Sequence, residues 1–195
     1  MSLRNEILEV SRDLLIQHGF SKLSMRNIAK RADVTATSIY LHFENKEHLL
    51  LALIDESIEH LKEELLAQID SSKDLFTQLE DLAKAYIRFA LEHPQEYEII
   101  YMVRPEEMPQ YPKEKFEKIR SAYELLAEII EKGKSEELID VENPMISAYT
   151  LWAQLHGVVS VILSKRLDTR IPQNEFISQA VDHIIQGFII QKTPA

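Results

Sequence analysis

The chain has 195 residues, of which 45% are hydrophobic, and a formal net charge of −10 at pH 7. This length and composition allow one large or two small domains with a full core, and the four glycines and scarce alternating apolar stretches favour an all-α fold. The lack of cysteine excludes disulfides, thiolate metal sites and cysteine nucleophiles, and it fits a reducing cytoplasm.

The negative charge is distributed unevenly along the chain. Residues 1–48 carry seven lysines and arginines against six aspartates and glutamates, which leaves fifteen against twenty-six in the remainder. A polyanion would therefore be repelled by most of the chain and would approach its N-terminal part. The simpler alternative, that the charges only solubilise helix surfaces, stays open at this point.

The first predicted helix covers residues 3–18. Ile7, Leu14 and Leu15 lie on its inward side, and Gly19 follows as the residue that ends the helix. Charged side chains occur throughout this N-terminal stretch between the apolar positions. We therefore interpret it as an amphipathic helix of a folded domain and not as a signal peptide.

Two short helices joined by a tight corner are predicted over residues 24–43. Ser24 is placed to cap the first helix. The apolar face of that helix has the spacing i, i+3, i+4 and i+7 and consists of Met25, Ile28, Ala29 and Ala32. Asp33 and Val34 form the corner. This pattern is typical of a helix-turn-helix and indicates DNA binding.

The second helix of the pair is predicted to present its outer face to DNA. Thr35 caps this helix, and Ile39 and Phe43 hold it to the core. Small and polar outer side chains suit a close approach to base edges or to flanking phosphates. Asn45 caps a further helix, whose first N–H groups and Lys46 would meet another phosphate. The predicted DNA-binding residues are Ser24, Arg26, Thr35, Ala36, Thr37, Ser38, Tyr40, His42 and Lys46.

These residues resemble the DNA-binding domain of the TetR family of bacterial transcriptional regulators. The resemblance covers roughly residues 5–50 and rests on Gly19-Phe20, Ser24-x-Arg-x-Ile-Ala-x-x-Ala, Val34-Thr35, Ile39-Tyr40-x-His42-Phe43 and Lys46-x-x-Leu49. The family usually has glycine where this chain has Asp33, and often glycine where it has Thr37. Aspartate tolerates the left-handed backbone better than most residues, so the first difference is mild. Thr37 adds a side chain to the DNA-facing surface, so this difference concerns which operator sequence the chain binds.

The rest of the chain is predicted to be helical. A long amphipathic helix over residues 46–69 connects a DNA-binding domain (1–48) to an effector-binding and dimerisation domain (49–195). Residues 104–112 contain three prolines and are expected to form a loop. Further helices are expected over residues 73–92, 94–103, 113–134, 145–163 and 174–191. The predicted fold is thus all-α, with a three-helix helix-turn-helix domain followed by a helical bundle.

The helix at 145–163 is apolar almost throughout, and its length would allow a membrane span. Polar side chains are spread around it and no second span exists, so we predict no membrane association. Residues 174–191 are also apolar on more than one side, and a wide apolar surface implies a second buried contact. We therefore predict a four-helix homodimer interface that includes Leu155, Gly157, Val159, Ile162, Leu163, Val181, Ile184 and Phe188.

The segment Trp152-Ala-Gln-Leu-His156-Gly157 is similar to the Trp-His-Gly signature of one C-terminal domain type among TetR regulators. Gly157 in mid-helix costs about 1 kcal/mol relative to alanine, which suggests a close helix approach at that point. For His156, a hydrogen-bonded position at a helix interface and a place in a ligand pocket are both open.

Aromatic and methionine side chains concentrate in the predicted C-terminal domain. Ordinary core packing explains each one singly, but as a group they exceed what a core needs and suit an adaptable pocket. TetR-like proteins usually bind a small effector there, and the resemblance implies the same here. The candidate effector-binding residues are Tyr86, Phe89, Tyr97, Tyr101, Met102, Phe116, Tyr123, Trp152 and His156.

An all-helical bundle could instead be a di-iron carboxylate enzyme, which requires glutamate three residues before histidine on facing helices. None of the seven histidines has that spacing, and no phosphate-binding glycine loop or nucleophile elbow occurs. We interpret His60, four residues after Glu56, as one partner of a solvated pair on a helix surface. We therefore predict no enzymatic activity, no catalytic residue, no metal and no cofactor.

The sequence thus predicts a cytoplasmic, homodimeric transcriptional regulator that binds double-stranded DNA at a pseudo-palindromic operator. The resemblance favours a repressor that a small organic effector releases. The alternative is a helical protein–protein interaction module in which DNA binding is constitutive or vestigial. Binding to the DNA upstream of its own gene separates the two hypotheses.

Overall fold

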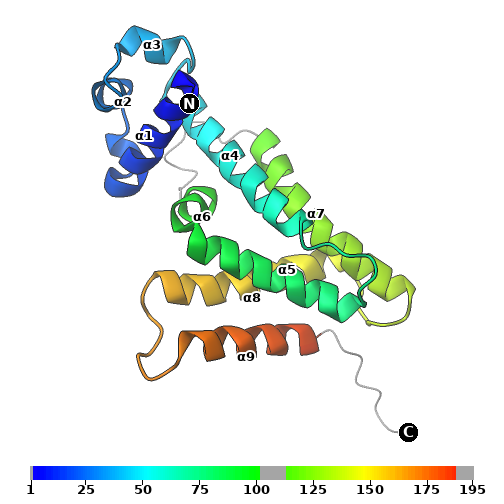
Figure 1. The fold of residues 1–195 in the computed structure, drawn as a ribbon. Coiled ribbons are helices and arrows are strands. Elements are labelled where there is room, and N and C mark those ends of the chain that lie inside the picture. The colour runs from blue at the N-terminus through cyan, green and yellow to red at the C-terminus, as the bar shows by residue number, and fades with distance from the viewer. Residues whose placement is uncertain (1, 102–112, 188–195) are drawn as a thin grey trace, which may run out of the picture. The chain divides into compact units, whose positions relative to one another are not determined.

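The computed structural model describes residues 2–101 and 113–187, and over these ranges it contains helices but no strand (Figure 1). This confirms the predicted all-α fold. The chain forms two compact units. Unit 1 consists of Met1–His60 and His93–Phe116, and unit 2 of Leu61–Glu92 and Glu117–Ala195. The predicted domain division at residue 48 concerns function and stays a prediction.

Unit 1 begins with α1 (Leu3–His18), which has the bounds that the sequence predicts. Ser2 caps it, because its Oγ accepts a hydrogen bond from the Asn5 backbone N–H at 3.3 Å. Gly19 ends it with φ 73°, a conformation that glycine adopts without the steric cost of a Cβ. The predicted inward residues Ile7, Leu14 and Leu15 are buried.

A short 3₁₀ helix, η1 (Phe20–Lys22), comes next. Three α-helices then follow in the order predicted: α2 (Met25–Arg31), α3 (Ala36–Tyr40) and α4 (Lys46–Leu66). The residue before each helix caps it by accepting a hydrogen bond from a backbone N–H of the first turn: Ser24 at 3.2 Å, Thr35 at 3.1 Å and Asn45 at 2.7 Å. Asp33 takes the left-handed backbone at the corner with φ 53°. The caps and the corner that the sequence predicts are therefore confirmed.

The long helix α4 ends earlier than the predicted Ile69. Beyond Leu66 the regular pattern gives way, because the N–H groups of Gln68 and Ile69 bond to carbonyls three residues back instead of four. Asp70 then forms a turn in which its carboxylate accepts hydrogen bonds from the backbone N–H and the hydroxyl of Ser72. The tightened last turn accounts for the three-residue difference.

The remaining helices of the described residues are α5 (Leu75–Glu92), α6 (Pro94–Tyr101), α7 (Lys113–Ser135), α8 (Pro144–Leu163) and α9 (Gln173–Gln186). The helix α5 starts two residues later than predicted, because the Asp74 carboxylate accepts hydrogen bonds from the backbone N–H groups of Phe76 and Thr77. The predicted loop at 104–112 and the predicted end of the last helix at 191 lie outside the described residues.

Unit 2 is built around α5, which packs against α8 and α9, while α8 and α9 run side by side (Figure 1). Among the described residues, α8 is the helix whose length and apolarity would allow a membrane span. Its apolar side packs inside unit 2, where Ala148, Leu151, Leu155 and Val159 are buried. Packing against neighbouring helices therefore explains the apolar residues on this side of α8.

Candidate nucleic-acid interface

The helix-turn-helix has a sharply divided surface. Ile39 and Phe43 are at most 1% exposed, whereas Tyr40 and Leu41, which lie between them in sequence, are 54% and 80% exposed. The helix α3 is therefore held to unit 1 by one side, and its other side is accessible. Leu41 lies outside the predicted set, because no sequence pattern distinguishes an exposed leucine from a core leucine.

All nine predicted DNA-binding residues lie at the surface of unit 1. Five are exposed, namely Arg26, Thr35, Thr37, Tyr40 and His42. Four are half-buried, namely Ser24, Ala36, Ser38 and Lys46. Arg26 lies on α2, Lys46 starts α4, and Ser24 and Thr35 are caps, whereas His42 lies in the turn after α3 and the other four lie on α3. Their contacts with DNA stay a prediction.

Two hydroxyls of this surface also shape the helix start. Thr35 Oγ1 and Ser38 Oγ lie 2.8 Å apart, and Thr35 Oγ1 accepts the Ser38 backbone N–H. Both side chains are thus positioned before any ligand arrives, which reduces the entropy lost on binding. The exposed Thr37 lies between them in sequence, on a helix of five residues with no charged side chain.

Lys46 is held at the edge of this surface. Its Nζ lies 4.1 Å from the centroid of the Phe20 ring, and Phe20 is itself buried. A cation over an aromatic face is attracted by the ring quadrupole, so the ammonium is positioned instead of moving freely. The Arg4 guanidinium lies similarly over Phe43, with Cζ 5.4 Å from the ring centroid.

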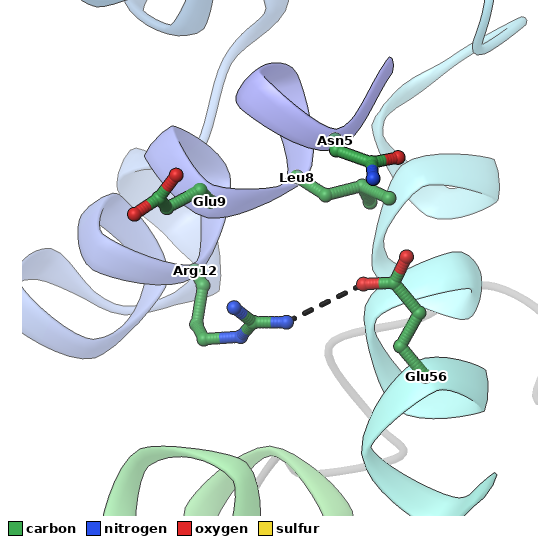
Figure 2. Close-up of a pocket in the computed structure, with 5 residues that line it drawn as sticks. All are labelled: Asn5, Leu8, Glu9, Arg12 and Glu56. Atoms are coloured by element: carbon green, nitrogen blue, oxygen red, sulfur yellow. Dashed lines mark hydrogen bonds and ion pairs between the residues drawn. The ribbon is translucent and has the colours of Figure 1, made fainter. Parts of the chain in front are cut away.

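A polar pocket of about 290 Å³ lies between α1 and α4 within unit 1. Its lining consists of Asn5, Leu8, Glu9, Arg12 and Glu56 (Figure 2). The Arg12 guanidinium extends across it toward Glu56, and the two groups lie 3.3 Å apart. The Nε atom of Arg12 is buried without a hydrogen-bond partner. This pocket has no counterpart in the sequence predictions.

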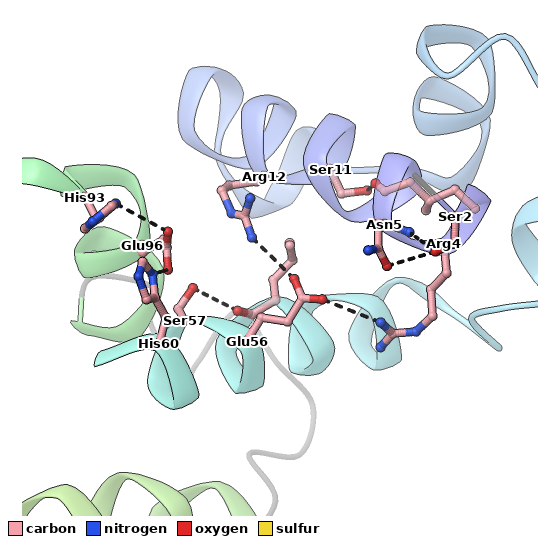
Figure 3. A network of polar contacts seen from close by, with 12 residues as sticks. Ser2, Arg4, Asn5, Ser11, Arg12, Glu56, Ser57, His60, His93 and Glu96 are labelled. Carbon is pink, nitrogen blue, oxygen red and sulfur yellow. Dashed lines mark hydrogen bonds and ion pairs between the residues drawn. The ribbon is translucent and has the colours of Figure 1, made fainter. Parts of the chain in front are cut away.

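Glu56 joins α4 to α1 through two ion pairs. Its carboxylate lies 3.3 Å from Arg12 and 3.5 Å from Arg4 (Figure 3). The predicted pairing of Glu56 with His60 on the surface of one helix is wrong, because each residue has an ion-pair partner on another helix. Glu56 turns to the arginines of α1, and His60 Nδ1 lies 3.0 Å from Glu96 Oε2 of α6. Packing between helices brings in partners that a spacing along one helix cannot show.

An aromatic cluster in unit 2 connects α5, α7 and α8. The Trp152 indole N–H donates a hydrogen bond to the Tyr86 hydroxyl at 3.1 Å. The Tyr123 ring lies 5.1 Å from the Trp152 ring and 4.6 Å from the Tyr149 ring. The His156 ring lies 5.2 Å from that of Trp152, and burial lowers the pKa of His156, which favours a neutral imidazole.

The structure divides the predicted effector-binding residues between the two units. Tyr86, Phe89, Tyr123, Trp152 and His156 belong to unit 2, whereas Tyr97 and Tyr101 belong to unit 1, where their rings lie 4.9 Å apart. Phe89 and Tyr97 are at most 1% exposed, as expected for core residues. Met102 and the side chain of Phe116 lie outside the described residues.

Two surface pockets lie in unit 2, and one of them is lined in part by Tyr149 and Trp152 of the aromatic cluster. One, of about 350 Å³, is lined by Met145, Ile146, Tyr149, Thr150, Trp152 and Ala153. The other, of about 520 Å³, is lined by Glu124, Ala127, Glu128, Glu131, Asn143, Pro144 and Met145. Apart from Trp152, the residues that line these two pockets lie outside the predicted effector-binding set.

Two family models match the chain. Residues 7–53 match the model of bacterial regulatory proteins of the tetR family. Residues 79–184, more than half of the chain, match the tetracycline repressor-like C-terminal domain. The chain belongs to the TetR family. The predicted Trp-His-Gly type of C-terminal domain stays a prediction.

Curated relatives of this TetR-family chain are known from bacteria. It is 32% identical over 92 residues to an uncharacterised HTH-type transcriptional regulator of Haemophilus influenzae, covering 47% of this chain and 49% of that one. It is also 32% identical over 85 residues to the probable acrEF/envCD operon repressor of Escherichia coli K12, covering 34% and 39%. The chain thus spans half or less of the length of these two relatives.

Solved structures share the fold over nearly the whole chain. A protein of unknown function from Rhodococcus sp. RHA1 superimposes with a TM-score of 0.82 at 24% identity, covering 97% of each chain. The fatty acid degradation regulator FadR of Bacillus halodurans does so with a TM-score of 0.78 at 18% identity, covering 93% of this chain and 94% of that one. At these identities the likeness is one of fold.

Four of the predicted dimer-interface residues of this TetR-family chain lie instead inside the protomer. Leu155, Val159, Val181 and Ile184 are between 0 and 5% exposed and fill the contact of α8 and α9 with each other and with α5. This corrects the prediction, because such side chains cannot also face a partner. Gly157 is exposed, and Ile162 and Leu163 are half-buried. Phe188 lies outside the described residues.

Proposed function

We propose that this TetR-family chain is a homodimeric DNA-binding transcriptional regulator, a repressor that a small organic effector releases from its operator. The observation that carries the proposal is the one-sided attachment of α3, whose exposed side chains flank core residues that are at most 1% exposed. A short helix that is fixed by one face and accessible on the other fits the width of the major groove.

The residues of this surface have different proposed roles. Tyr40, His42 and Lys46 contact phosphates and fix the position of the protein on the duplex. Thr37 and Ser38 lie near the start of α3, where recognition helices meet base edges, and they influence which sequence is preferred. Phosphate contacts supply affinity for any DNA sequence, whereas base contacts supply sequence specificity. Substitutions at the phosphate-contacting residues and at the base-contacting residues therefore have distinguishable effects.

The proposed dimer contact lies on the exposed side of α8. Ile146, Tyr149, Ala153 and Gly157 are exposed and share one face at helical spacing. A Cβ added at Gly157 would meet nothing within 4 Å inside the protomer, so the protomer itself does not require glycine there. Close approach by a partner helix would explain the glycine. A symmetric dimer in turn implies a pseudo-palindromic operator.

The proposed effector site is the aromatic cluster of unit 2. Tyr86, Tyr123, Trp152 and His156 combine apolar ring faces with a few polar atoms that can orient a ligand. The Tyr86 hydroxyl and the Trp152 indole already bond to each other, so a ligand would have to offer apolar contact and exchange this hydrogen bond. This chemistry favours a flat, mainly apolar organic molecule with one polar group.

The proposed link between effector and DNA is α4. This single helix starts at Lys46 in unit 1 and continues past His60 into unit 2. A change of its tilt would alter the separation of the two α3 helices in the dimer. We place the regulator in the cytoplasm and assign it no catalytic role, in keeping with a family of DNA-binding regulators.

The test is a footprint on DNA upstream of the chain's own gene, with the purified full chain. We expect protection of a pseudo-palindrome whose half-sites lie about one helical turn, or a small multiple, apart. Mass spectrometry of ligand released from the purified protein would supply the effector for the same assay. If no duplex is protected while the chain retains a protein partner, the interaction-module alternative is right and the proposal is wrong.

A further inference from the structure

Three metal-ligating side chains meet in unit 1 where α4 packs against α6. His60 comes from α4, His93 precedes α6, and Glu96 lies in the first turn of α6 (Figure 3). One donor atom from each lies within 4.8 Å of the others. The Glu96 carboxylate lies between the two imidazoles, 3.0 Å from His60 Nδ1 and 3.8 Å from His93 Nδ1.

These separations are close to those of a coordinated ion. With metal–ligand bonds of 2.0–2.1 Å, neighbouring ligand atoms of a tetrahedral site lie about 3.3 Å apart. His60 Nδ1 lies 3.0 Å from Glu96 Oε2 and His93 Nδ1 lies 3.8 Å from Glu96 Oε1, so each imidazole faces a different oxygen of the same carboxylate at a distance near this value. The two imidazole rings already meet edge to face, with centroids 4.6 Å apart. Small side-chain rotations, without a shift of either helix, would bring the three donors to one ion.

The backbone fixes two of the three donors on one rigid element. Pro94 opens α6 with a fixed φ, and the His93 carbonyl accepts the Tyr97 N–H at 3.0 Å as the first hydrogen bond of that helix. His93 and Glu96 are therefore three residues apart across a helix start, where side chains are neighbours. The third donor, His60, lies well within α4, and His93 is the single residue that connects α5 to α6.

The donor set selects a class of ion. Two imidazoles and one carboxylate suit zinc and similar divalent transition metals, whereas magnesium and calcium prefer oxygen donors throughout. Three protein ligands leave a fourth position for water or another ligand. The side chains of His60 and His93 are 36% and 35% exposed and that of Glu96 is 18% exposed, so an ion can reach them from solvent.

We propose that His60, His93 and Glu96 form a binding site for one divalent transition-metal ion of the zinc class. The bound ion would tie α4 to α6 within unit 1. The sequence alone predicts no metal, because the di-iron motif places glutamate three residues before histidine, whereas this chain has His93-x-x-Glu96. The proposal does not rest on DNA binding, and its test does not involve DNA.

The experiment uses the full chain after dialysis against a chelator and then into a non-chelating buffer. Zinc chloride is titrated by calorimetry, and cobalt chloride is titrated with visible absorption, which reports the ligand geometry. We expect one ion per protomer and a higher melting temperature with zinc. His93→Ala and Glu96→Gln should each weaken binding by about 100-fold or more, because loss even of a group that only supports a ligand costs about 10–100-fold.

Glu96→Gln guards against an unfolded variant, because glutamine keeps the size and hydrogen bonding of Glu96 but is a poor ligand. His18→Ala is the matched control, since His18 is exposed at the end of α1 in the same unit. Equal binding by wild type, His93→Ala and Glu96→Gln would overturn the proposal. So would the absence of stoichiometric zinc binding, or an equal loss in His18→Ala, which would indicate adventitious surface binding only.

Discussion

Replacement of Lys46 by alanine tests the proposed DNA interface most directly. Each phosphate contact on B-DNA releases about 0.9 counterion, which at 0.15 M salt favours binding by about 5-fold, or about 1 kcal/mol. A dimer carries two copies of Lys46, so Lys46→Ala should weaken operator binding by about 30-fold and make the salt slope shallower by about 1.8. A non-operator duplex should lose affinity to the same extent.

The structure adds a correction to this estimate. The Lys46 ammonium lies 4.1 Å from the Phe20 ring centroid, so the substitution also removes a cation–π contact worth about 0.5–1 kcal/mol of stability. Thermal unfolding of the variant measures that loss separately from DNA binding. Lys46→Arg keeps the charge and should keep the salt slope.

The assay is fluorescence anisotropy with a labelled duplex between 50 and 200 mM salt. Lys132→Ala is the charge-matched control, because Lys132 lies on α7 in unit 2 and pairs with Glu136. It should change neither affinity nor slope appreciably. If Lys46→Ala left both quantities at their wild-type values, the start of α4 would not contact DNA and its assignment would be wrong.

Four further predictions follow from the geometry. Glu56→Gln removes two ion pairs of partly exposed groups and should lower the free energy of unfolding by about 1 kcal/mol in urea denaturation. An unchanged free energy of unfolding would mean that the two pairs do not stabilise the fold. Gly157→Leu should give a folded monomer in sedimentation, and a stable dimer of this variant would place the interface elsewhere. Ile184→Glu should instead unfold the protomer, because Ile184 is buried. Burial lowers the pKa of His156, so the unfolded chain binds a proton at this imidazole more readily than the folded chain. The free energy of unfolding should therefore fall as the pH drops below about 6.5, the pKa of an unperturbed histidine. His156→Gln should make part of that decline less steep. Operator DNA should weaken effector binding by the same factor as the effector weakens operator binding, typically about 5–150-fold, and calorimetry measures this factor. Equal effector affinities with and without operator would exclude release of the DNA by the effector.

The helix-turn-helix could be predicted residue by residue because its determinants are local. Ser24, Thr35 and Asn45 each bond to a backbone N–H within three residues, and the turn at Asp33 depends on its own φ. Apolar spacing then fixes which side of each helix faces the core. Neither determinant requires knowledge of what packs against the element.

The C-terminal half could not be predicted to the same depth, because its contacts join distant residues. An apolar helix such as α8 has one side in the protomer core and another at the surface, and the sequence does not say which is which. The apolar pattern therefore predicts a dimer contact for Leu155 and Val159, although both pack inside the protomer. Ile146 and Tyr149, at 62% and 41% exposed, lie on the other side.

The same limit applies to charged and metal-ligating side chains. Spacing along α4 suggests that Glu56 and His60 pair with each other, but each has a partner from another helix. Glu96, which pairs with His60, is 36 residues away along the chain, and Arg12, one of the two partners of Glu56, is 44 residues away. A search by short motifs therefore misses sites whose members come together only by folding.

The absence of charge on α3 has a consequence for how the regulator would behave when a cell loses water. Ala36–Tyr40 contain no ionisable cation or carboxylate, so the surface proposed to discriminate between bases exchanges no counterions with DNA. Rising salt would then lower the affinity for every site by a common factor and leave the order of preference among sites intact. The weakest sites would lose the protein first, and none would gain it at the expense of a stronger one.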